Sequence, residues 1–165
     1  MEEGVDTPLT MEQQLEALSR LNLTKVKAKL MGPLPEGRDW TQEYADTAER
    51  WYRRYLTLII KYPKQNHAPN QMVDEFWHQH IVDTRSYIAD CQNIFGRYIH
   101  HNPYFGATGD RAECIATFNR TNELYRREFG EDPTEFGATA INCSTDCGWV
   151  DDNSQTLVNE KEMCT

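Results

Sequence analysis

The segment VDEFWHQHIVDTRSYIADCQNIFGRYIHHNPYFG, residues 73–106, holds four of the five histidines of this 165-residue chain and one of its five cysteines. Its apolar residues recur every three or four positions, as they do on one face of an α-helix. The spacing predicts one helix over about 71–81 and a second helix that Asp83 caps. The apolar face of the second helix continues to His101, and Pro103 then ends that helix.

Helical spacing of apolar residues recurs outside this segment. Four further helices are predicted, at about 11–21, 24–31, 41–62 and 111–129. Thr10 and Gln13 have the spacing of a capping box. Thr24 can cap the second of these helices, and Gly130 suits the end of the last. Because the sequence shows no strand-like alternation, the predicted fold is all-α, a single-domain helical bundle of about five to six helices with an irregular C-terminal tail.

Length and composition describe one helical domain with polar ends. A chain of 165 residues that is 39% apolar can bury a single core. The predicted parts are an N-terminal tail over 1–9, the helical domain over 10–137 and an irregular cysteine-containing segment over 138–165. Within the domain, residues 63–70 form a predicted linker in which His67 is solvated.

Charge and hydropathy exclude several classes of protein. A formal net charge of -9 argues against nucleic acid as a partner, because such binding depends on Lys and Arg neutralising phosphates. No apolar run approaches the ~20 residues that span a bilayer, so no membrane partner is expected. The acidic N-terminus is not a secretory signal, and the odd number of cysteines suits free thiols. We expect a soluble cytoplasmic protein, whose protein partners the sequence does not indicate.

Helix geometry separates the histidines. His78 and His80 are two positions apart, which places them about 200° apart around a helix. Asp74 and His78 are one turn apart and face the same way. His80 and His101 instead continue apolar stripes.

These residues predict a metal site between the two helices of the central segment. Imidazole and carboxylate ligands suit Zn²⁺, Fe²⁺ or Mn²⁺, and helical bundles often hold such sites. No organic cofactor is indicated. Use of both His78 and His80 would require a local break in the helix. The preferred ligands are Asp74, His78, His80 and His101, with Cys91 and His100 in reserve.

The same segment offers groups for catalysis on a small-molecule substrate. Asp83 or Asp90 could act as general base toward a metal-bound water, with Tyr87 as a further candidate catalytic residue. Trp77 and Tyr104 would line the pocket beside the cofactor. Hydrolytic and oxidative chemistry both stay open.

A non-catalytic interpretation accounts for the same residues. In an interaction domain, His80 and His101 would be core histidines with hydrogen-bond partners, and Cys91 a small buried hydrophobe. Near the C-terminus, Cys143 and Cys147 form a C-x3-C pair, and one interpretation is a second metal or redox site completed by Cys164 or Cys114. Incidental thiols in an exposed tail are the favoured explanation, because the second pair of a metal site is missing.

The central motif also resembles the helical domain of the glycine-rich domain-containing protein-like family, over about residues 40–130. The resemblance rests on Val73, Asp74, Trp77, His78, His80, Ile81, Asp83, Tyr87, Asp90, Cys91, Gly96, His100, His101, Pro103 and Tyr104. It implies an intracellular, mainly helical domain and no particular reaction. With only 9 glycines and no glycine-rich tract, the chain resembles a stand-alone version of that domain.

Overall fold

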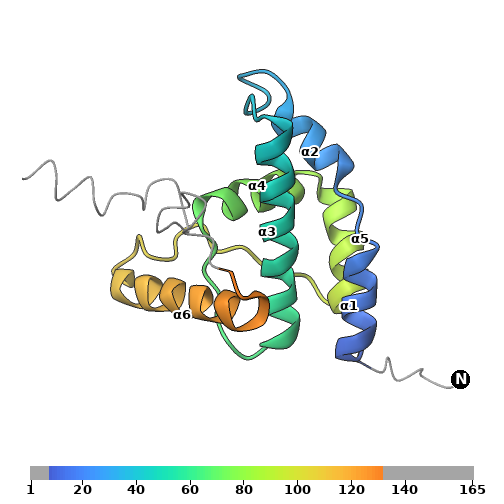
Figure 1. Cartoon of the computed structure of the whole chain (residues 1–165). Coiled ribbons are helices and arrows are strands. Elements are labelled where there is room, and N and C mark those ends of the chain that lie inside the picture. Colours follow the sequence, from blue (N-terminus) through green and yellow to red (C-terminus); the bar gives the residue numbers. More distant parts are fainter. Residues whose placement is uncertain (1–7, 132–165) are drawn as a thin grey trace, which may run out of the picture. The chain divides into compact units, whose positions relative to one another are not determined.

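The computed structural model describes residues 8–131, and within that range it contains six α-helices and no β-strand. The prediction of an all-α fold with five to six helices is confirmed. The helices are α1 (Met11–Ser19), α2 (Thr24–Met31), α3 (Gln42–Lys61), α4 (Gln71–Val82), α5 (Thr84–Phe95) and α6 (Arg111–Phe129) (Figure 1). The irregular segment predicted over 138–165 lies outside the described residues, and so do Cys143, Cys147 and Cys164.

The chain divides into two compact units. The first comprises the chain up to Gln65 together with Glu75–His101, and the second comprises Asn66–Asp74 together with the chain from Asn102 onward. The division inside α4 falls between Asp74 and Glu75, where the helix runs on without interruption. No helix of the described range is both long enough and apolar enough to cross a membrane.

Helix α3 forms the centre of the first unit. Helix α1 packs against α3 and α5, and α2 packs against α3 (Figure 1). The apolar stripe that begins at Tyr44 of α3 is buried at Trp51, Tyr52 and Tyr55, which form part of the core. From α4, the ring of Phe76 lies 5.2 Å from that of Tyr52. The first residue of the stripe differs, because Tyr44 is 40% exposed.

The helix ends test the capping predictions. The Thr10–Gln13 capping box is present, and Asp83 accepts a hydrogen bond from the Ser86 backbone N–H at 3.4 Å. The role predicted for Thr24 is wrong. Thr24 is the first residue inside α2, and its N–H is bound by the side chain of Asn22 at 3.1 Å.

The predicted end of α5 is also wrong, and this error affects the site. The helix stops at Phe95 and not near Pro103, because Gly96 adopts a left-handed conformation with φ 66°. Its backbone N–H closes the last turn on the carbonyl of Gln92. The chain from 97 to 101 is therefore irregular, and it presents His101 from outside any helix.

The second unit is organised around α6. Its bounds and its Gly130 cap, with φ 68°, are as predicted. Phe118 and Cys114 form a small apolar cluster with Ala68, whose N–H donates to Thr121 Oγ1 at 3.1 Å. Because the chain beside Ala68 packs in this way, His67 is half-buried, and its prediction as a solvated residue is wrong. Ile115 of α6 is 46% exposed.

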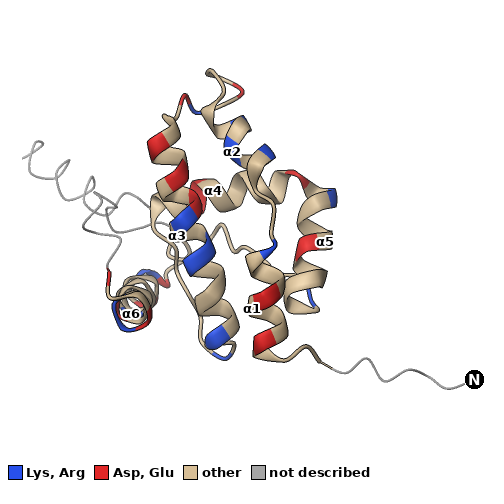
Figure 2. Cartoon of the chain, turned by 45° about the vertical axis from the view of Figure 1, so that its right-hand side comes forward, with Lys and Arg blue, Asp and Glu red and all other residues tan. Residues whose placement is uncertain are grey.

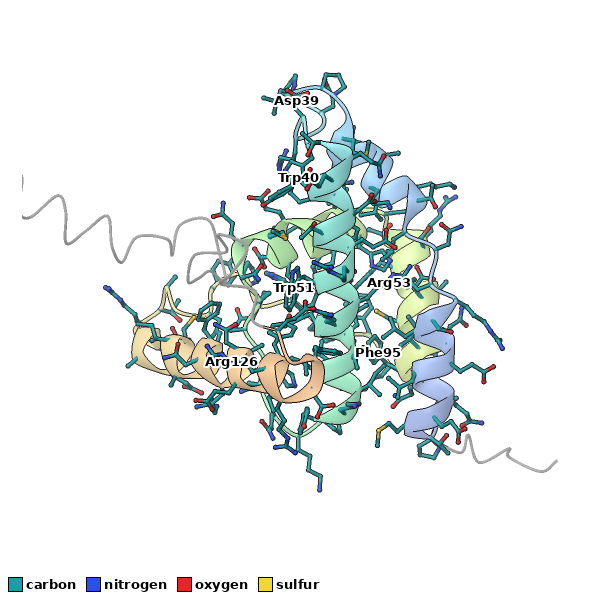
Figure 3. The ribbon with its side chains drawn as sticks, in the orientation of Figure 1. Asp39, Trp40, Trp51, Arg53, Phe95 and Arg126 are labelled. Atoms are coloured by element: carbon teal, nitrogen blue, oxygen red, sulfur yellow. The ribbon has the colours of Figure 1, made fainter. Side chains whose placement is uncertain are left out.

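The acidic residues of α3 lie toward its start and the basic residues toward its end (Figure 2). Lys27 of α2 pairs with Asp46 at 2.6 Å and with Glu49 at 2.8 Å. Arg53 lies on the side of α3 toward α1, where it donates to the carbonyls of Leu18 at 3.1 Å and Leu21 at 2.6 Å (Figure 3). These basic residues are therefore engaged within the unit.

Candidate metal centre

Helix α4 supplies two candidate ligands from adjacent turns of one face. Asp74 and His78 are four residues apart, so their side chains project the same way from an uninterrupted helix. Asp74 is only 3% exposed, whereas His78 is half-buried. The regular geometry of α4 thus fixes a carboxylate beside an imidazole before any other element contributes.

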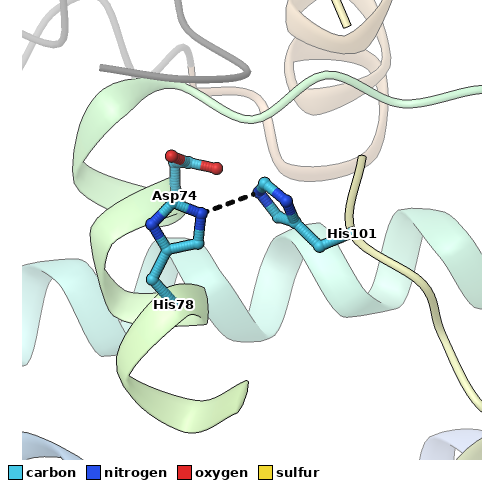
Figure 4. A group of neighbouring side chains, drawn as sticks. All are labelled: Asp74, His78 and His101. Carbon is cyan, nitrogen blue, oxygen red and sulfur yellow. Dashed lines mark hydrogen bonds between the residues drawn. The ribbon is translucent and has the colours of Figure 1, made fainter. Parts of the chain in front are cut away.

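The irregular segment after Gly96 supplies the third ligand. Its His101 faces His78, and the two Nε2 atoms are 3.1 Å apart (Figure 4). One potential ligand atom from each of Asp74, His78 and His101 lies within 4.8 Å of the others. These three residues constitute the histidine–aspartate site.

The spacing of the two imidazole nitrogens suits a transition-metal ion. With metal–ligand bonds of about 2.0–2.1 Å, two ligands of one ion are separated by roughly 3.0–3.4 Å. The Nε2 pair at 3.1 Å already has this separation. Two imidazoles and one carboxylate form a ligand set typical of zinc and non-haem iron sites that keep open coordination positions.

A single hydrogen bond joins the imidazoles of His78 and His101. A distance of 3.1 Å between two ring nitrogens requires one Nε2 to donate and the other to accept. An ion bound at this point would need both Nε2 lone pairs, so it would replace this hydrogen bond. The ring of Trp77 lies edge-on to His101 at 4.6 Å between ring centroids and limits where that imidazole can move.

His80 lies elsewhere, because the helix break that it would need to join His78 is absent from α4. It is 3% exposed, and its Nδ1 and Nε2 lie 2.9 Å from Tyr52 Oη and 3.0 Å from Asp90 Oδ2. Burial lowers the pKa of His80, although its hydrogen bond to Asp90 opposes this effect. The ring is neutral at pH 7, and the pKa of Tyr52, raised by burial, keeps its hydroxyl protonated. Tyr52 therefore donates to Nδ1, and Nε2–H donates to the Asp90 carboxylate.

A second buried network connects α4, α5 and the irregular segment. Trp77 Nε1–H donates to Tyr87 Oη at 2.9 Å, and Tyr87 donates to the carbonyl of Ile99 at 2.7 Å. Burial raises the pKa of Tyr87 and also that of the Cys91 thiol. Cys91 is 3% exposed. At neutral pH, both side chains are therefore protonated and act as packed, hydrogen-bonded groups.

The remaining predicted residues lie apart from the histidine–aspartate site. His100 is exposed, with its ring 4.8 Å from that of Tyr98. Tyr104 is 67% exposed. Asp83 caps α5, and its pKa is lowered chiefly by the hydrogen bond from Ser86. Of the six predicted metal ligands, the structure brings together Asp74, His78 and His101. Sequence reasoning did not identify Tyr52 as the partner of His80, since it lies 28 positions earlier in another helix.

Comparison with protein families gives a match. The family model described as UCP032817-like covers residues 18–130, which contain α2 to α6 and all three residues of the histidine–aspartate site. No curated protein matches the chain, and no solved structure matches it.

Proposed function

The chain belongs to the UCP032817-like family, and from that starting point we propose that it is a metal-binding helical protein whose histidine–aspartate site holds one divalent transition-metal ion. The observation that supports this proposal is the convergence of three ligand atoms within 4.8 Å. Two of them come from adjacent turns of α4 and one from a separate segment, so the group is not formed by a single helix face alone. The resemblance of the chain to the glycine-rich domain-containing protein-like family is not part of this match and stays a prediction.

The ligand chemistry favours Zn²⁺, Fe²⁺ or Mn²⁺. Neutral imidazole suits the first two, and a carboxylate suits all three. Three protein ligands leave at least one coordination position open, and a bound ion could there polarise a small molecule or activate water. We therefore include catalysis on a small molecule in the proposal. His78 and His101 are half-buried, which leaves a path for solvent and for the ion.

A second candidate function is supported by the contacts of the histidines with each other. The Nε2–Nε2 hydrogen bond and the edge contact of Trp77 engage both rings without an ion. Under this alternative, the chain is a non-catalytic interaction domain whose histidines stabilise the segment that follows Gly96. Metal binding by the purified protein separates the two candidates.

The test is a Zn²⁺ titration by calorimetry on the full chain, purified without a histidine tag and stripped with a chelator. Substitutions Cys143→Ser, Cys147→Ser and Cys164→Ser form the background, because thiolates outside the site would also bind zinc. We expect one ion per chain. Elemental mass spectrometry of the protein as purified identifies the natural metal.

Two variants locate the ion. His101→Ala removes one of three ligands and should abolish stoichiometric binding. His100→Ala removes the adjacent exposed imidazole and should leave the affinity unchanged. A protein that binds no divalent ion, or one in which His101→Ala binds as well as the unsubstituted chain, would overturn the proposal and favour the interaction domain.

A further inference from the structure

His101 lies in a segment without helical hydrogen bonds, so other contacts must hold it in place. An irregular segment does not by itself hold a side chain to the precision that a metal site needs. Between Gly96 and His101 the chain must therefore be fixed by contacts with other elements. The site depends on what those contacts are.

The hydroxyl of Tyr87 provides one of these contacts. It donates to the carbonyl of Ile99 at 2.7 Å, two residues before His101. The same oxygen accepts from Trp77 Nε1–H at 2.9 Å. Tyr87, Trp77 and Ile99 are all buried, with exposed fractions of 2%, 4% and 6%. Hydrogen bonds so removed from water have little competition from solvent.

The two hydrogen-bond partners of this hydroxyl lie close in sequence to His78 and His101. Trp77 precedes His78 in α4, and its ring lies edge-on to His101 at 4.6 Å between centroids. Ile99 belongs to the segment that carries His101. One oxygen atom therefore joins the ligand-bearing turn of α4 to the ligand-bearing segment, with its own ring anchored in α5.

We propose that Tyr87 is a positioning residue of the histidine–aspartate site, and that its hydroxyl holds His101 toward Asp74 and His78. This inference rests on the proposed metal-binding function and assigns Tyr87 a role other than catalysis. Removing a group that orients a metal ligand through a hydrogen bond commonly changes metal affinity by about 10–100-fold. The same range is expected for the Tyr87 hydroxyl.

The variant Tyr87→Phe removes the hydroxyl and keeps the ring in the core. Its matched control is Tyr52→Phe, which also removes one buried tyrosine hydroxyl with a hydrogen bond to a side chain of α4. Zn²⁺ titration of both variants separates positioning from general loss of stability. Tyr87→Phe should weaken zinc binding by about 10–100-fold, and Tyr52→Phe should leave it unchanged although it also destabilises the fold. Equal affinities in the two variants would overturn the inference.

A metal-free readout keeps the inference independent of zinc binding. Nitrogen NMR of the imidazoles reports the hydrogen bond between His78 and His101. Tyr87→Phe should shift the His101 signals, and Tyr52→Phe should shift those of His80. If the unsubstituted chain binds no zinc, the proposed function fails and these signals alone decide the role of Tyr87, with unchanged His101 signals overturning it. If Tyr87→Phe does not fold, Trp77→Phe, which removes the donor to the same hydroxyl, takes its place in both measurements.

Discussion

Single residues of the central motif differ chiefly in how far their side chains are exposed to solvent. Cys91 is enclosed by the core, and burial raises the pKa of its thiol. In the unfolded chain the pKa of the thiol is about 8.5. Because the folded form holds its proton to higher pH, Cys91 contributes stability that is fully present below about pH 8.5 and is lost as the pH rises through the folded pKa.

This contribution can be measured as a difference in pH dependence. Urea unfolding of the unsubstituted chain and of Cys91→Ala should be compared between about pH 7 and pH 9.5, a range that contains the ordinary thiol pKa. The free energy of unfolding should fall more steeply with rising pH for the unsubstituted chain. Parallel curves would show that the Cys91 thiol titrates alike in the folded and unfolded states.

At the scale of secondary-structure elements, the end of α5 determines whether His101 can reach the site. Gly96 and Gly130 both end helices with positive φ, at 66° and 68°. An added Cβ at Gly96 would meet only Leu9, at 3.9 Å, and at Gly130 nothing within 4 Å. Alanine at either position should therefore cost about 1–2 kcal/mol through backbone strain alone. Thermal or urea unfolding measures that cost.

The two glycines should differ in their effect on the site. Gly96→Ala alters the start of the segment that carries His101, so Zn²⁺ affinity should fall together with stability. Gly130 caps α6, far along the chain from the ligands. Gly130→Ala should therefore lower stability with no change in zinc affinity. If both variants bind zinc equally well, the conformation of Gly96 does not control the position of His101.

Arg53 stabilises another element, the C-terminal end of α1. Its guanidinium donates to the carbonyl of Leu18 in the last turn of α1, which also accepts from the Leu21 N–H, and to the carbonyl of Leu21 just after the helix. Arg53→Met keeps most of the aliphatic stem and loses these bonds, so the free energy of unfolding should fall by about 1–2 kcal/mol. Arg20→Met is the control, since that exposed side chain pairs only with Glu16 at the surface and should matter far less. Similar losses in urea unfolding of both variants would contradict this account.

At the scale of the whole molecule, metal binding should be coupled to folding. An ion that binds only the folded chain stabilises it by about 2.7 kcal/mol when free metal is 100 times the dissociation constant. The melting temperature should rise with added Zn²⁺ and return to its starting value with a chelator. His100→Ala should retain this shift, whereas His101→Ala should show none.

Local sequence was enough to predict that six helices form and that two candidate ligands share one face of a helix. Periodicity placed all six helices, and the start of α3 and both ends of α6 followed from Thr41, Arg111 and Gly130. The relation of Asp74 to His78 also followed from sequence, because both lie on one regular helix and helix geometry depends only on spacing. The same geometry separated His80 from His78.

Only the tertiary structure decided which residues meet across elements. The apolar face of α5 appeared to continue through Tyr98, since periodicity does not show that Gly96 takes a left-handed conformation and ends the helix. The pairing of His78 with His101 and of His80 with Tyr52 joins positions 23 and 28 apart. Such contacts depend on how the helices pack and on which buried groups need a partner, and neither is encoded in the spacing of residues along one helix.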